Sequence, residues 1–259
     1  MIYIPRKLIN KKDKSSKFIP CLYVPHADGS SKLMVCFHGN AEDTGYAKDL
    51  YISLQAYIKM HILSVEYPGY GIYNGKPNAE QILDDARTVL KFLINDAKIL
   101  PENLIIYGRS IGAGPACSMA VEFNPGMLVL ISAYRCLKDV VKDLAAKYKL
   151  GWLAGVLFAD RFRNIDIMPL LKCPTFFLHG QNDDLIPLQH SQDLISKCVC
   201  KSVLHIPFEM DHNTFDYKTD FAVPFLKFSS QVNLKFEPDK EKCINFKKEY
   251  YEIPNLESK

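Results

Sequence analysis

Strand-like and helix-like segments alternate along almost the whole of this 259-residue chain. Helical periodicity fills most of the gaps between apolar runs, as in the segment that follows Asn78, a plausible helix N-cap. Such alternation predicts an α/β fold with right-handed crossovers, a mostly parallel central sheet and helices on both faces. Ligands in such sheets bind at the carboxyl ends of the strands. The strand-like runs are 18–24, 32–39, 61–71, 103–107, 127–132, 175–179 and 202–206.

We expect residues 18–228 to form one domain, because 48% hydrophobic residues in a chain of this length suffice for a single large core. Within it, residues 133–172 form a long amphipathic insert that holds the only tryptophan, Trp152. We favour a small helical cap over the strand ends here, rather than an ordinary crossover helix with a loop. Residues 229–259 carry six Lys/Arg and six Asp/Glu with few aliphatic side chains, which predicts a loosely ordered polar tail.

Residues 1–17 form a basic N-terminal segment with six Lys/Arg and one Asp. Apolar residues such as Ile2 and Ile4 stand beside these charges, so the segment fits either peripheral contact with anionic lipid or a solvated charged run. It lacks the apolar core of a signal peptide, and no run of 18 apolar residues follows. We therefore expect no membrane span.

The eight cysteines predict buried free thiols, since several lie inside apolar strand-like runs. Cys198 and Cys200 form a C-x-C pair without the partner pair that a zinc site needs, so we expect no metal. A reducing, cytoplasmic location follows from this cysteine usage, with peripheral membrane contact left open. The net charge of +3 is too small to predict nucleic acid as the main partner.

The sequence Gly108-Arg109-Ser110-Ile111-Gly112 fits the pattern G-x-S-x-G, with a strand-like run before it and a helix-like segment after it. In such an elbow the glycines allow a sharp turn, and the serine oxygen is exposed on a strained backbone. The pattern alone is weak, but its context makes Ser110 a candidate nucleophile. A flexible glycine-rich turn is the alternative.

A nucleophilic serine needs a base, and the base needs a third group to fix its tautomer. The expected chain order is serine, acid, histidine. Four histidines follow Ser110, and His212 is favoured because it lies in a loop after a strand-like run. Asp183 is the favoured acid because it lies in a polar turn after another strand-like run. Asp184 and Asp211 remain alternatives, the latter with a loop-shaping role.

The oxyanion hole of such a site takes one N–H from the residue after the nucleophile, here Ile111. The second N–H comes from the loop after an early strand, and Asn40 in His38-Gly39-Asn40-Ala41 is the natural donor. A tight turn with a buried imidazole is the structural alternative for His38 and Gly39, and both interpretations can hold together.

Five motifs in this order resemble the α/β-hydrolase superfamily, and within it the ABHD-type serine hydrolases that include protein depalmitoylases. The resemblance covers roughly residues 18–228. It implies an α/β-hydrolase fold with the triad Ser110, Asp183 and His212, and with Asn40 and Ile111 as oxyanion donors. The motifs are FHGNAED (37–43), YPGYG (67–71), GRSIGAGP (108–115), HGQNDDLIP (179–187) and DHN (211–213).

The chain departs from these relatives in three places that leave the triad untouched, one of which is a tail beyond Phe228 that is longer than expected. It has no cysteine before Cys21, where the depalmitoylases carry an acylated cysteine-rich segment, and Glu209-Met210-Asp211 replaces a glycine-rich loop before the histidine. We expect a cofactor-free serine hydrolase that cleaves acyl esters or thioesters through an acyl-enzyme, with S-acylated protein or lipid as substrate. A small-ester carboxylesterase, a serine peptidase and a non-catalytic binding protein on the same fold remain alternatives.

Overall fold

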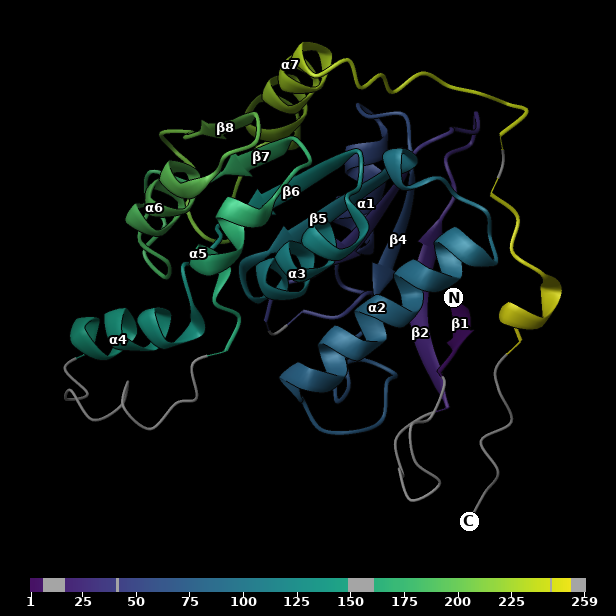
Figure 1. Ribbon diagram of the computed structural model, residues 1–259, viewed down its shortest axis with the longest axis horizontal. Helices are drawn as coiled ribbons and strands as arrows, with labels where there is room; N and C mark the ends of the chain where they lie inside the picture. Colours follow the sequence, from purple (N-terminus) through teal and green to yellow (C-terminus); the bar gives the residue numbers. More distant parts are fainter. Residues whose placement is uncertain (7–16, 41, 149–160, 243, 253–259) are drawn as a thin grey trace.

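A computed structural model describes residues 1–6, 17–40, 42–148, 161–242 and 244–252. These residues form one eight-stranded sheet with the strand order β1-β2-β4-β3-β5-β6-β7-β8 (Figure 1). Strands β3 to β8 run parallel, whereas β1 and β2 pair antiparallel at one end, so the mostly parallel sheet expected from the alternation is confirmed. The strands are β1 (Ile2–Pro5), β2 (Phe18–Val24), β3 (Leu33–Phe37), β4 (His61–Val65), β5 (Leu104–Arg109), β6 (Met127–Ile131), β7 (Thr175–Leu178) and β8 (Ser202–His205).

Helices cover both faces of this sheet, as the sequence predicts. Buried side chains of α2, α3 and α6 belong to one hydrophobic cluster, and those of α1 and α7 belong to a second cluster across the sheet. The helices are α1 (Lys48–Gln55), α2 (Ala79–Asn95), α3 (Ala113–Phe123), α4 (Leu137–Lys147), α5 (Asn164–Ile167), α6 (Gln189–Lys197) and α7 (Val223–Gln231). Shorter 3-10 turns are η1 (Pro101–Asn103), η2 (Ser110–Gly112), η4 (Met168–Leu170) and η6 (Lys248–Tyr250), and η5 (Tyr217–Ala222) is a π-helical turn before α7.

Continuous apolar strands explain why the sheet is buried on both sides. Val35 of β3 faces the first cluster, while its neighbours Met34 and Cys36 face the second, because successive side chains of a strand point to opposite faces. Local capping adds to this pattern at α2. The Asn78 side chain accepts hydrogen bonds from two backbone N–H groups of the first turn, as expected for its N-cap.

The parallel strands place the predicted site residues at one edge of the sheet. The loop after β3 carries Asn40, and the corner after β5 carries Ser110. Asp183 follows β7, and His212 lies in the loop after β8. Because the carboxyl ends of parallel strands meet at the same edge, segments far apart in the sequence converge there.

Two terminal segments contribute buried side chains to the domain. Residues 1–17 begin with β1, whose side chains Ile2 and Ile4 are fully buried in the first cluster. The tail also contacts the domain, because Phe246 is buried against the rings of Tyr23 and Phe92. Alternating apolar residues in β1, and one aromatic ring in the tail, therefore supply buried surface that charge composition alone does not reveal.

The predicted cap falls partly outside the described residues, which exclude 149–160 and with them Trp152. Its described part includes α4, which projects beyond the sheet in Figure 1 and is tied to α6 by a hydrogen bond of 2.7 Å between Asp143 Oδ2 and His190 Nε2. The basic residues that suggested membrane contact also lie largely in the undescribed range 7–16, so this contact and the cytoplasmic location remain predictions. None of the described helices combines the length and the apolarity that a membrane span requires.

Candidate active site

Ser110 stands at the corner where β5 turns into η2 and α3. Its φ of 52° lies in the left-handed region, which a residue with a Cβ seldom adopts. Flanking glycines allow the corner, because a Cβ on Gly108 would overlap the carbonyl oxygen of Gly112, and a Cβ on Gly112 would overlap that of Phe37. The serine is 8% exposed, and the backbone places it at the start of the helical segment. This is the strained elbow that the pattern G-x-S-x-G predicts.

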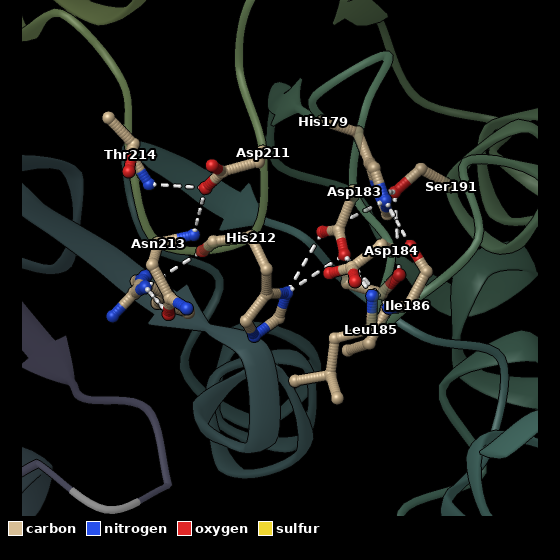
Figure 2. Close-up of polar contacts among 12 residues, drawn as sticks. His179, Asp183, Asp184, Leu185, Ile186, Ser191, Asp211, His212, Asn213 and Thr214 are labelled. Atoms are coloured by element: carbon tan, nitrogen blue, oxygen red, sulfur yellow. Dashed lines mark hydrogen bonds and ion pairs between the residues drawn. The ribbon is translucent and has the colours of Figure 1, made fainter. Parts of the chain in front are cut away.

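Asp183 and His212 contact one another across the loops after β7 and β8. The ring nitrogen His212 Nδ1 lies 2.9 Å from Asp183 Oδ2 and 3.1 Å from Oδ1 (Figure 2). Backbone N–H groups of Leu185 and Ile186 donate to Asp183 Oδ1 at 3.1 Å and 2.8 Å, which fixes the carboxylate. With Nδ1 donating to Asp183, His212 Nε2 is the ring nitrogen left free to act as a base.

The surroundings of Asp183 favour its ionised form. Burial acts to raise the pKa of this carboxyl, but the hydrogen bond and the charge of His212 oppose burial. The N–H group of Ile186 adds to their effect, and the pKa ends below its ordinary value. An ionised Asp183 can hold His212 in one tautomer and stabilise the imidazolium that forms when the ring takes a proton.

The other two candidate acids occupy different positions. Asp184 points outward and forms an ion pair of 2.8 Å with Lys147 at the end of α4; its side chain is 77% exposed. Asp211 accepts hydrogen bonds of 2.7 Å from the N–H groups of Asn213 and Thr214, so it shapes the loop that carries His212 (Figure 2). Asp183 is therefore the one of these three carboxylates that contacts the histidine.

His179 is a buried histidine whose two ring nitrogens both have partners. Nδ1 lies 2.7 Å from Ser191 Oγ, and Nε2 lies 2.8 Å from the carbonyl oxygen of Ile186. Burial lowers the pKa of His179, which keeps the ring neutral. Nε2 also lies 3.4 Å from Asp183 Oδ2, so His179 belongs to the buried polar surroundings of that carboxylate.

Asn40 lies in a loop whose backbone is hydrogen-bonded to the buried imidazole of His38. His38 Nδ1 is 2.9 Å from the carbonyl oxygen of Gly39, and His38 Nε2 is 3.0 Å from Glu66 Oε1. The Gly39 carbonyl and the Asn40 N–H belong to one planar trans peptide and point in opposite directions. Holding the carbonyl against His38 therefore directs the Asn40 N–H away from the imidazole. The structure shows the buried imidazole of His38, and the role of Asn40 as an oxyanion donor stays a prediction.

The sequence gives no signal for Arg109 and Glu42, which form a buried ion pair between the elbow and the Asn40 loop. Arg109 stands at a variable position of the G-x-S-x-G pattern, and its partner lies 67 positions earlier in the chain. A periodicity argument cannot find such a pair, because only the parallel sheet brings β3 and β5 side by side.

The candidate site consists of side chains and backbone groups of the chain itself. Among the described residues, no group of three or more His, Cys, Asp or Glu side chains has an arrangement suited to a metal ion. The seven cysteines that the structure describes are free thiols. A nucleophile on a strained turn, a carboxylate-oriented imidazole and a loop of backbone donors can together perform acyl transfer.

Solved structures with a similar chain trace define the fold. An esterase from Exiguobacterium antarcticum superposes with a TM-score of 0.63 over 90% of this chain and 99% of its own, at 17% sequence identity. An esterase from Pyrococcus furiosus gives a TM-score of 0.64 over 89% and 98%, at 15% identity. The chain therefore has the α/β-hydrolase fold.

Curated sequences add a particular group of relatives within that fold. Alpha/beta hydrolase domain-containing protein 17B from Homo sapiens is 30% identical over 181 residues, which are 70% of this chain and 60% of that protein. Alpha/beta hydrolase domain-containing protein 17C from Xenopus laevis is 28% identical over 188 residues, which are 72% of this chain and 58% of that protein. The chain thus spans less than two thirds of the length of these relatives. Their similarity confirms the resemblance that the five motifs indicate, although no protein-family model matches the chain.

Proposed function

We propose that this chain is a serine hydrolase that cleaves acyl esters or thioesters. The observation that carries the proposal is the hydrogen bond of 2.9 Å between His212 and Asp183. The loop that holds His212 is also hydrogen-bonded to Arg109, next to the Ser110 elbow. Arg109 immediately precedes Ser110, and its guanidinium donates to the carbonyl oxygen of His212 at 2.8 Å. The segment that carries the nucleophile and the segment that carries the base are therefore joined by a hydrogen bond.

In the proposed reaction, Ser110 Oγ attacks the acyl carbonyl carbon while His212 Nε2 takes the hydroxyl proton. Asp183 accepts a hydrogen bond from Nδ1 of the imidazolium. The N–H groups of Asn40 and Ile111 donate hydrogen bonds to the carbonyl oxygen and stabilise the negative charge that develops on it. The tetrahedral intermediate then expels the alcohol or thiol, which takes the proton from His212. Water, deprotonated by the same imidazole, attacks the acyl-enzyme and releases the carboxylic acid and Ser110.

An apolar acyl chain is the substrate group that we favour. Large apolar side chains are exposed in several loops at the same edge of the sheet, and a contiguous patch of such side chains marks a ligand or partner site. Tyr46 and Phe208 are 79% and 78% exposed, and Ile72 and Leu185 are also exposed. They lie in segments that follow β3, β8, β4 and β7 respectively, the strands whose carboxyl ends meet at the edge that carries the candidate site. S-acylated protein or lipid fits such a rim.

A chain-length series tests this proposal. Hydrolysis would be measured for p-nitrophenyl esters and matched thioesters of increasing acyl length, with Ser110→Ala as the blank. We expect kcat/KM to rise with each methylene, by up to about fourfold if the methylene is fully buried. Activity limited to acetyl esters would instead indicate a small-ester carboxylesterase, and preference for peptide amides would indicate a peptidase. No turnover by the folded protein would favour a binding protein.

A further inference from the structure

Arg109 contacts both loops that flank Ser110. Its Nη2 donates to the carbonyl oxygen of His212 at 2.8 Å and to Asn213 Oδ1 at 3.3 Å. Its Nη1 forms the ion pair with Glu42 Oε1. The other oxygen of Glu42 accepts the backbone N–H of Gly39 at 3.2 Å, directly before the Asn40 peptide. One guanidinium thus connects the histidine loop with the predicted oxyanion loop.

The side chains that make these contacts are largely shielded from solvent. The side chains of Arg109 and Glu42 are 8% and 13% exposed. Burial lowers the pKa of Arg109, and the negative charge of Asp183 acts in the opposite direction. A buried ion pair gains little net stability over an apolar pair of the same shape, so stability alone is a weak reason for this one. Its fork geometry, by contrast, can fix the relative position of two backbones.

We propose that Arg109 and Glu42 are positioning residues, which align the Asn40 N–H and the His212 ring with Ser110 at the same time. This inference rests on the proposed hydrolase function. Asp183 holds the histidine ring, but Arg109 holds the backbone that carries it. His38 likewise holds the Gly39 carbonyl, while Glu42 holds the Gly39 N–H, so the orientation of the following peptide depends on both.

The test compares Arg109→Met, Arg109→Lys and Glu42→Gln with wild type, using the best ester substrate. We expect kcat to fall about 100-fold in Arg109→Met with KM changed by less than about threefold, because misplaced groups lose interactions made in the transition state. Arg109→Lys restores the charge without the fork, so we expect it to recover part of kcat. Glu42→Gln should also lower kcat.

A boronic acid inhibitor gives a second readout, because its tetrahedral adduct with serine mimics the transition state. Its Ki should rise in step with the loss of kcat/KM, which a change in folded fraction alone would not produce. Arg87→Met is the matched control. Arg87 also pairs with two carboxylates, Asp84 and Glu122, but it lies on α2 and is more exposed. Its kcat should match wild type.

The double variant Arg109→Met/Glu42→Gln completes a double-mutant cycle, which measures the coupling between the two residues. If the two residues act through one contact, the double loss should be much smaller than the product of the single losses. An active wild type with kcat within about twofold in every folded variant would overturn the positioning role, as would losses confined to KM. If Arg109→Met does not fold, Arg109→Lys and Glu42→Gln still decide the question. A wild type without turnover would instead refute the proposed function.

Discussion

Replacing Asp183 with asparagine should nearly abolish turnover while leaving the fold intact. The carboxylate accepts one hydrogen bond from His212 Nδ1 at 2.9 Å and two more from the backbone N–H groups of Leu185 and Ile186. An asparagine can keep the backbone contacts through its oxygen, but its amide then donates to Nδ1 and forces the proton onto Nε2. In that tautomer His212 cannot accept the serine proton. We expect kcat to fall about 10⁴-fold, which is about 5 kcal/mol of transition-state stabilisation.

The assay is ester hydrolysis at neutral pH with equal concentrations of folded protein, and folding is checked by circular dichroism. Asp184→Asn is the matched control, since this neighbouring carboxylate is exposed and pairs only at the surface with Lys147. Its kcat should stay within about twofold of wild type. The reasoning would be refuted if Asp183→Asn kept a tenth or more of the wild-type rate, or if Asp184→Asn were the more damaging change.

Three further predictions concern stability, measured by urea unfolding. Gly112→Ala should lower the free energy of unfolding by about 3 kcal/mol or prevent folding, because its Cβ would overlap the carbonyl oxygen of Phe37; an unchanged midpoint would contradict this. Asn78→Ala should cost about 1 kcal/mol through the lost cap of α2, whereas Asn95→Ala in the last turn should cost less. Finally, the pKa of Asp183 is depressed in the folded state, so its stabilisation is present above the ordinary carboxyl pKa and lost as pH falls. Wild type should therefore exceed Asp183→Ala in stability at pH 7, and the part of this difference due to ionisation should shrink as pH falls through about 4 and be lost only below the depressed folded-state pKa; a difference independent of pH would count against it.

Much of the fold could be predicted because the chain's local signals agree with its topology. The N-cap at Asn78 and the serine between Gly108 and Gly112 are local patterns with a direct backbone cause. The acid and the histidine could be chosen because both follow strand-like runs, and strand ends in a parallel sheet converge. Contact between Asp183 and His212 follows from that convergence.

The features that sequence reasoning missed depend on contacts between distant segments. Strand β1 is only four residues long and lies beside a basic run, so its buried Ile2 and Ile4 have little local signal. Phe246 is buried by rings from β2 and α2 although its own neighbours are polar. The pairing of Arg109 with Glu42 is likewise invisible until the sheet places the two loops together.

The most direct test of the central claim is labelling by a fluorescent fluorophosphonate, compared between wild type and Ser110→Ala. An activated serine reacts with such a probe, whereas an ordinary serine hydroxyl does not. We expect folded wild type to be labelled to about one probe per chain and Ser110→Ala not to be labelled. Absence of labelling in folded wild type, or equal labelling of Ser110→Ala, would contradict the assignment of Ser110 as the nucleophile.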